Sequence, residues 1–310
     1  MPEIIVLGGG LTGLAAALEL QRLGLPYTLI EVKPRLGGAI CSQTRAGFVF
    51  DGGRFLLERY DSWPWLDELG LKHAVRRLAP YRDGELVYFA GGTQQLTDAM
   101  AERVTGEVLV RMAASSLGEM GRGFGVCLEN GVLRTADAVV VALPARYAAH
   151  LLYELVPEAA LLLEDYRYDP VARVSLGYAL EDVPADLPAP VDTRIKFIQR
   201  LTMPERVPEG GVMVRAGVRV GDSPPDDAAL AEIVRAQLGA HEPLAVWVRY
   251  WPEADPLTGR LPEFPGTLAA VRAALPLRVA LAGSDYGAFR LDQQVAAGKA
   301  AAQQVAAALA

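Results

Sequence analysis

Three glycines near the start of the chain have the spacing of a phosphate-binding turn. Gly8, Gly10 and Gly13 follow the apolar run 4–7, and apolar residues then recur at helical spacing until Gly24. In such a turn the first glycine permits a tight bend, the second lets a pyrophosphate approach the backbone, and the third lets the helix pack on the strand. The start of the helix adds free N–H groups and a partial positive charge. The spacing therefore predicts a dinucleotide site.

An acidic residue, Glu31, ends the next apolar run, 27–30, and lies 18 residues after Gly13. At this spacing a carboxylate accepts hydrogen bonds from the ribose hydroxyls of a dinucleotide and repels a 2′-phosphate. The turn and the acid do not by themselves separate NAD from FAD.

Residue types that usually act as bases or nucleophiles are sparse. His73, His150 and His241 are isolated in the sequence, and we interpret them as structural. Cys41 and Cys127 have neither disulfide nor metal-ligand spacing, so we expect two buried thiols in a reducing cytoplasm and no metal site. No serine has the context of a nucleophile elbow. If a cofactor carries out the redox step, the protein needs only to orient the substrate and to keep water out of the pocket.

The elements that must position these residues fall into two groups. Continuous apolar runs of the kind found in buried parallel strands occur at 4–7, 27–30, 108–110, 138–142 and 277–282. Between about 147 and 274 the pattern changes, and segments with strand character alternate with connectors rich in Pro and Asp, at 171–178, 196–200, 212–220 and 244–250. Helices are expected at 228–238 and 293–309.

These patterns predict an α/β fold in two domains. A Rossmann-like dinucleotide-binding domain would be discontinuous, because its strands occur on both sides of the changed region. The inserted second domain would be α+β, with a mixed or antiparallel sheet covered by helices, and would carry the substrate site. The expected bounds are 1–60, 90–146 and 275–310 for the first domain and 61–89 and 147–274 for the second.

Two further segments resemble a known superfamily. Residues 31–38, EVKPRLGG, resemble the E-x-x-x-R-x-G-G signature of the flavin-dependent amine oxidases and phytoene desaturases, and residues 47–53, GFVFDGG, are similar to their G-F-x-x-D-x-G segment. In that superfamily the acid binds the adenosine ribose, and the Arg and glycines wrap the pyrophosphate side. The resemblance therefore implies FAD. Arg35 beside a glycine pair would be a natural anion clamp.

Within the superfamily the sequence most resembles the protoporphyrinogen oxidases. Residues 91–96, 138–145 and 169–178 are similar to their helix start and two of their strands. The tail 281–298 resembles their second flavin motif, in which a glycine at the position of Gly283 and a following helix N-terminus hold the pyrophosphate and the flavin C2 carbonyl. A helix N-terminus there would stabilise reduced flavin.

The chain also departs from these oxidases. They insert a large helical substrate domain where this chain has only the connection 71–91, so the cover that encloses a tetrapyrrole would be largely missing. Their basic residue after the glycine pair is Ala39 here. Ser284 stands where Asn or an acid is usual, which makes Asp285 the alternative cofactor contact. Arg290 replaces a small residue near the flavin, and we interpret it as a surface residue in preference to one that projects toward the flavin.

The motif and the resemblance together imply the following FAD contacts: Gly8, Gly10, Leu11, Thr12, Gly13, Glu31, Val32, Arg35, Gly37, Gly38, Gly53, Val110, Ala142, Gly283, Ser284, Asp285, Leu291 and Val295. No catalytic residue is identified. Lys196 is a candidate because some relatives use a lysine to position a water near flavin N5, Arg290 because of its place in the tail, and Tyr178 as one of several aromatic residues that could line a pocket or form core.

Composition limits the partners. A formal charge of −7 and a pI near 5.2 argue against nucleic acid or an anionic membrane surface, and no uncharged apolar run reaches the roughly 18 residues of a membrane span. We expect a cytoplasmic FAD-dependent oxidoreductase that takes hydride from a small or flat amine or reduced heterocycle, with oxygen or a quinone as acceptor. Homo-oligomers stay possible. The alternatives are a flavoenzyme of mutase or isomerase type and a non-catalytic FAD-binding module that needs a partner.

Overall fold

The computed structural model describes residues 2–53, 55–59, 63–82, 84–221 and 223–310. Its first layer is a five-stranded sheet in the order β17-β12-β1-β2-β8, in which every neighbouring pair is parallel. The strands are β1 (Ile4–Leu7), β2 (Tyr27–Glu31), β8 (Glu107–Val110), β12 (Ala138–Val141) and β17 (Val279–Leu281). The apolar runs form these strands because helices cover both faces of the sheet.

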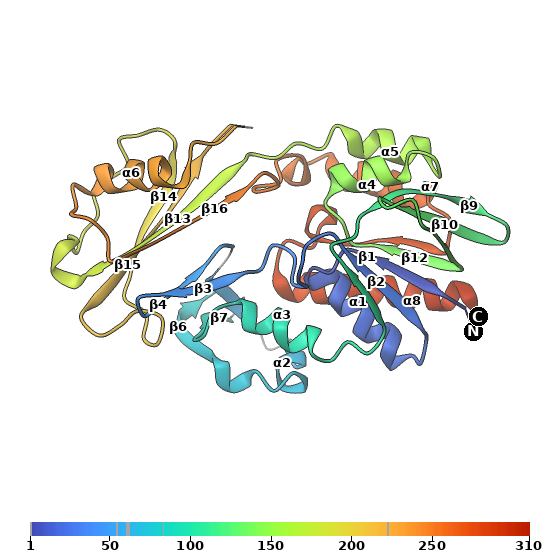
Figure 1. The fold of residues 1–310 in the computed structure, drawn as a ribbon, viewed down its shortest axis with the longest axis horizontal. Coiled ribbons are helices and arrows are strands. Elements are labelled where there is room, and N and C mark those ends of the chain that lie inside the picture. The colour runs from blue at the N-terminus through green and yellow to red at the C-terminus, as the bar shows by residue number, and fades with distance from the viewer. Residues whose placement is uncertain (1, 54, 60–62, 83, 222) are drawn as a thin grey trace.

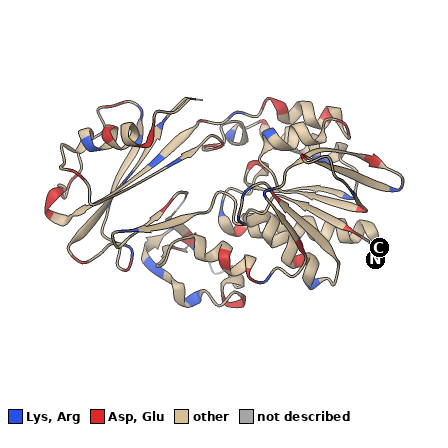
Figure 2. Cartoon of the chain, in the orientation of Figure 1, with Lys and Arg blue, Asp and Glu red and all other residues tan. Residues whose placement is uncertain are grey.

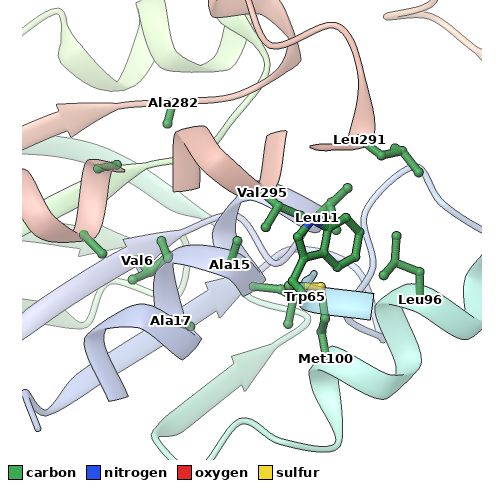
Figure 3. Close-up of a cluster of buried hydrophobic side chains, with 14 of the residues drawn as sticks. Val6, Leu11, Ala15, Ala17, Trp65, Leu96, Met100, Ala282, Leu291 and Val295 are labelled. Atoms are coloured by element: carbon green, nitrogen blue, oxygen red, sulfur yellow. The ribbon is translucent and has the colours of Figure 1, made fainter. Parts of the chain in front are cut away.

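Alternate side chains of β1 enter two different apolar clusters. Ile4 and Val6 pack with α1 (Leu11–Arg22), α3 (Gln94–Ala101) and α8 (Leu291–Leu309), as Figure 3 shows for part of this cluster. Ile5 and Leu7 point the other way. They pack with α4 (Ala145–Leu152), α5 (Pro157–Glu164), α7 (Phe264–Ala274) and the antiparallel sheet of β9 (Ala114–Met120), β10 (Gly123–Leu128) and β11 (Leu133–Ala136).

The second large sheet lies at the opposite end of the molecule (Figure 1). It is antiparallel throughout, in the order β14-β15-β13-β16. Its strands are β13 (Val171–Ala179), β14 (Ile195–Leu201), β15 (Gly211–Arg219) and β16 (Ala245–Trp251). Helix α6 (Asp227–Leu238) covers one face; Asp226 caps it by accepting a hydrogen bond from Ala229 N at 2.7 Å, and Gly239 ends it at a φ of 59°.

Smaller elements fill the space between the two sheets. The hairpin β3 (Ser42–Arg45) and β4 (Phe48–Asp51) packs Phe48 and Phe50 against β15 and β16. A three-stranded sheet is formed by β5 (Leu57–Arg59), β6 (Val75–Tyr81) and β7 (Gly84–Phe89). Single helical turns occur at α2 (Trp65–Glu68), η1 (Lys72–Ala74), η2 (Leu180–Asp182), η3 (Thr258–Arg260) and η4 (Ser284–Tyr286).

The predicted fold class is confirmed, and the second sheet is antiparallel. The packing differs from the expected domain bounds in two places. Helices α4, α5 and α7 share an apolar cluster with the parallel sheet, although most of their residues fall within the predicted second domain, 147–274. Apolar residues of 63–89 likewise pack with α1 and α8. We therefore propose narrower bounds, with the inserted domain limited to about 169–255.

Candidate functional site

The predicted phosphate-binding turn joins β1 to α1, and its three glycines serve different purposes. Gly8 has a φ of 99°, and a Cβ there would lie 2.4 Å from the carbonyl oxygen of Ala142. A Cβ on Gly13 would lie 1.8 Å from the Gly8 oxygen. The packing of the protein therefore requires glycine at positions 8 and 13. A Cβ on Gly10 would meet only Gly38 Cα, at 3.8 Å, so the space in front of Gly10 is free for a ligand.

Glu31 lies at the carboxyl end of β2, where the sequence places the ribose contact. Its side chain is buried, with Oε2 accepting from Gly9 N at 2.7 Å and Oε1 from Lys33 N at 2.8 Å. Each carboxylate oxygen can accept a further hydrogen bond. Val32 and Val110 flank it with exposed fractions of 57% and 40%, which offers apolar surface beside the predicted ribose position.

The loop after Glu31 closes over the glycine turn. Gly37 N donates to Gly9 O at 2.7 Å, and Gly38, with a φ of 59°, faces Gly10. Arg35, predicted to clamp an anion, donates to the carbonyls of Leu36 and Ile40, both at 2.8 Å. In this structure its guanidinium holds the loop in shape.

The C-terminal segment approaches the same edge of the sheet. Gly283 has a φ of 151°, and Ser284 is exposed. The buried carboxylate of Asp285 accepts from Ala145 N at 2.9 Å and also from Tyr168 Oη. Burial raises the pKa of Asp285. Its Oδ2 thus holds the start of α4, whereas its Oδ1 accepts only from Ser284 Oγ, at 3.2 Å, among the described residues.

Several other predicted contacts have side chains in the protein core. Leu11, Leu291 and Val295 are less than 10% exposed and belong to the cluster shown in Figure 3. Thr12 is also buried. Leu11 and Leu291 are the first residues of α1 and α8, so they present backbone N–H groups, not side chains, to a cofactor.

Tyr178, a candidate for catalysis, lies away from the cofactor loops. It is fully buried in the cluster between the second sheet and α6, on the same side as Val174 and Leu176. Side chains alternate along a strand, so this face of β13 points away from the cofactor loops. The aromatic residue is core.

The two remaining candidates have ion-pair partners. Lys196 Nζ lies between Asp169, at 2.8 Å, and Asp255, beside the two connections that link the sheets. Arg290 is the N-cap residue of α8 and pairs with Asp292 at 2.8 Å. Both contacts are structural, and the catalytic roles considered for these residues stay untested.

The opposite face of the second sheet meets the cofactor loops, and the sequence motifs did not identify this face. Trp251 Nε1 donates to Gly52 O at 2.6 Å, and Arg215 donates to the carbonyl of Gly53. A Cβ on Gly52 would meet side-chain atoms of Arg249 and Trp247 at 3.0 and 3.2 Å. The sequence feature that could have identified this face is the alternation of Arg and Trp with apolar residues in 171–178, 212–220 and 244–250.

Comparison with known proteins decides the family. Residues 68–306, well over half of the chain, match the model of the flavin containing amine oxidoreductases, and residues 6–69 match an NAD(P)-binding Rossmann-like domain. The chain belongs to the flavin-containing amine oxidoreductase family. The superfamily resemblance is thereby confirmed.

Among curated relatives of this flavin-containing family, the coproporphyrinogen III oxidase of Bacillus subtilis (strain 168) is 40% identical over 81 residues, which is 24% of this chain and 17% of that protein. The putrescine oxidase of Kocuria rosea is 36% identical over 90 residues, 28% and 18% of the two chains. The matched part is thus less than a fifth of either relative. A solved structure from Exiguobacterium sp. 255-15, provisionally assigned as a protoporphyrinogen oxidase, is 15% identical with a TM-score of 0.80 over 98% of both chains, and shows the same fold.

The residues present fit the flavin of this family. A pyrophosphate suits the open space at Gly10 and the start of α1, which has no acidic residue in its first turn. A ribose suits the buried carboxylate of Glu31. FAD is the cofactor of this member of the flavin-containing family. In the part of the chain that the structure describes, no helix is both long and apolar enough to cross a bilayer.

Proposed function

We propose that this protein oxidises a small or flat amine or reduced heterocycle with FAD as the hydride acceptor. The observation that carries the proposal is the direct contact between the cofactor loops and the second sheet. Trp251 and Arg215 bind the carbonyls of Gly52 and Gly53, so a substrate on this face of the sheet would lie beside the cofactor. Bound FAD would accept the hydride and pass the electrons to oxygen or a quinone.

The protein's own contribution is to bind and to exclude water. Glu31 would accept hydrogen bonds from the adenosine ribose, and the first N–H groups of α1 would bind the pyrophosphate. Trp247 and Trp251 form an aromatic wall opposite the loops, with Trp247 also packed at 6.5 Å from Phe50 between ring centres. Aromatic walls orient flat substrates and keep the site dry.

An anaerobic substrate screen tests the proposal. The FAD-loaded protein is mixed with amines and with reduced heterocycles in the absence of oxygen, and loss of the flavin absorbance is followed. Bleaching by a member of either group is the expected result. A protein that cannot be loaded with FAD would refute it. Flavin that dithionite reduces but no substrate bleaches would favour a non-catalytic module, consistent with the short β6–β7 hairpin that replaces a large cover.

A further inference from the structure

Lys33 lies where the loop after β2 meets the second sheet. Its N–H donates to Glu31 Oε1 at 2.8 Å, and its carbonyl accepts from Arg111 N at 3.1 Å. Its Nζ donates to Gly38 O at 3.2 Å and lies 5.5 Å from the centre of the Trp251 ring. The side chain therefore runs from the predicted ribose contact to the glycine pair 37–38 and ends beside the aromatic wall.

Gly38 borders the predicted pyrophosphate position. A Cβ on Gly38 would lie 2.8 Å from Gly10 Cα, whereas a Cβ on Gly10 would meet only Gly38 Cα, at 3.8 Å. The free space in front of Gly10 thus lies next to the residue whose carbonyl holds the Lys33 ammonium. Because the lysine side chain is long and flexible, its ammonium can reach an anion bound in this space.

In the described part of the chain, the Lys33 ammonium has no carboxylate at ion-pair distance. One of its three N–H donors binds Gly38 O, and the side chain is half-buried. Arg249 lies over the same Trp251 ring at 5.1 Å, so a second cation shares this ring. A partly buried cation in such a position is costly until an anion binds it.

Within residues 32–41, all of them described, Arg35 is the only other basic residue. It is committed to the carbonyls of Leu36 and Ile40, and Ala39 is uncharged. Glu31 adds a negative charge beside the turn. The start of α1 contributes roughly half a positive charge, which is less than the two negative charges of a pyrophosphate. The site therefore needs a further cation, and Lys33 is the one at hand.

The charge of the whole molecule does not supply this attraction. Acidic and basic residues are interspersed along the ribbon (Figure 2), and the formal charge is −7. An anionic cofactor would be repelled by this net charge unless a local cation binds it.

We propose that the Lys33 ammonium binds the pyrophosphate of FAD and supplies the positive charge of the cofactor site. Two of its donors are available to phosphate oxygens while the third stays on Gly38 O, and hydrogen bonds between charged groups are short and strong. Lys33 would also link the cofactor to the substrate side, because its ammonium lies over Trp251. The inference concerns FAD binding and holds whichever substrate is oxidised.

ADP and adenosine separate the pyrophosphate contact from the ribose contact. Both carry the ribose that Glu31 would bind, but only ADP has a pyrophosphate. In calorimetric titrations of the FAD-free protein, Lys33→Gln should raise the Kd of ADP about tenfold and that of adenosine less than about twofold. Lys33→Arg should keep the Kd of ADP within about threefold of the wild type, since the charge is retained.

Lys72→Gln is the matched control, because Lys72 is exposed and its partner Asp67 is 3.6 Å away. Neither ligand should bind differently to this variant. An equal loss of affinity for ADP and adenosine in Lys33→Gln would show that the lysine only shapes the loop. An unchanged Kd for ADP would refute the proposal, and so would a loss of ADP affinity in Arg249→Gln alone.

Reductive methylation tests the contact without a substitution. The chain has four lysines, Lys33, Lys72, Lys196 and Lys299. ADP should slow the methylation of Lys33 by about fivefold or more, because an ion-paired ammonium is covered and harder to deprotonate, whereas adenosine should not. The rate at Lys72, measured in the same peptide digest, should not change. Equal rates at Lys33 with and without ADP would overturn the proposal.

Discussion

At the scale of single residues, the glycine turn contains one glycine that folding requires and another that the predicted ligand requires. Gly13 has no room for a Cβ, because the Gly8 oxygen would be 1.8 Å away. Gly10 has room, and its φ of −74° is one that any residue adopts. The predicted pyrophosphate contact would explain why Gly10 is small.

Gly10→Ala should therefore leave folding intact and damage cofactor binding. We expect the free energy of unfolding of the apo protein to change by less than about 1 kcal/mol, and the Kd for FAD to rise at least tenfold. Gly13→Ala, the matched control, should lose roughly 1–3 kcal/mol or more of stability. Urea denaturation and FAD titration measure the two effects. Unchanged FAD affinity in Gly10→Ala would remove the argument for a pyrophosphate at this turn.

Tyr178 gives a second prediction at this scale. Its buried hydroxyl has no hydrogen-bond partner among the described residues, so Tyr178→Phe removes a desolvated group and no hydrogen bond seen there. Stability should stay the same or rise by up to about 1 kcal/mol, and the rate of flavin reduction should not change. Stopped-flow reduction and thermal unfolding check this. A large loss of rate would restore the residue as a catalytic candidate.

The pH dependence of stability gives an independent test of the same burial. Burial raises the pKa of Tyr178 to about 12, above its ordinary value of 10.0. The neutral Tyr178 hydroxyl makes its full contribution to the free energy of unfolding below pH 10. This contribution is lost as the pH rises toward 12, because the tyrosine ionises at lower pH in the unfolded chain than in the folded protein. Between pH 9 and 11.5 the Tyr178→Phe protein should lose less free energy of unfolding than the wild type. If the free energy of unfolding falls equally with pH in the two proteins, the raised pKa of Tyr178 is contradicted.

At the scale of elements, the connections between the two sheets are tied together. Tyr168 and Pro256 form an isolated antiparallel bridge, and Asp169 N donates to Asp255 O at 3.1 Å. Lys196 joins the carboxylates of both connections, with Asp169 at 2.8 Å. These contacts hold the second sheet against the cofactor loops.

Lys196→Met should therefore weaken the link and leave the chemistry intact. Loss of two partly buried charge contacts should cost about 1–2 kcal/mol of stability and increase proteolysis at the connections, while the rate of flavin reduction changes less than about twofold. Arg194→Met, which breaks an exposed pair with Asp192, serves as control. A large drop in rate with unchanged stability would instead indicate a catalytic lysine.

Strands and turns were predictable because period, apolar runs and glycine spacing are local properties. Other features depend on contacts that no local pattern contains. Asp51 pairs in the core with Arg206, 155 residues away, although the sequence shows Asp51 only as part of a motif. Alternation in β13 shows that Arg173 and Tyr178 lie on opposite faces, but not which face meets the cofactor. Helices α5 and α7 were missed because Pro-rich surroundings hide their short apolar periods.

At the scale of the whole molecule, the cofactor should connect distant parts of the chain. Most of the predicted contacts come from the first βαβ unit and from the segment that begins at Gly283, which follow β1, β2 and β17 at the carboxyl ends of the parallel strands. A ligand that binds only the folded state stabilises it by about 2.7 kcal/mol at a concentration of 100 times its Kd. The Tm should therefore rise with FAD concentration in the wild type and stay flat in Gly10→Val. A Tm independent of FAD in both would contradict the site.

The bridge between Tyr168 and Pro256 has a consequence for how the substrate preference of this protein can evolve. The chain leaves the nucleotide domain and returns to it at one place, and the segment between carries Trp247 and Trp251 and none of the predicted FAD contacts. One contiguous stretch of gene would therefore encode the proposed substrate wall. Recombination at its two ends could replace that wall without disturbing the flavin, so cofactor and substrate preference can be inherited separately.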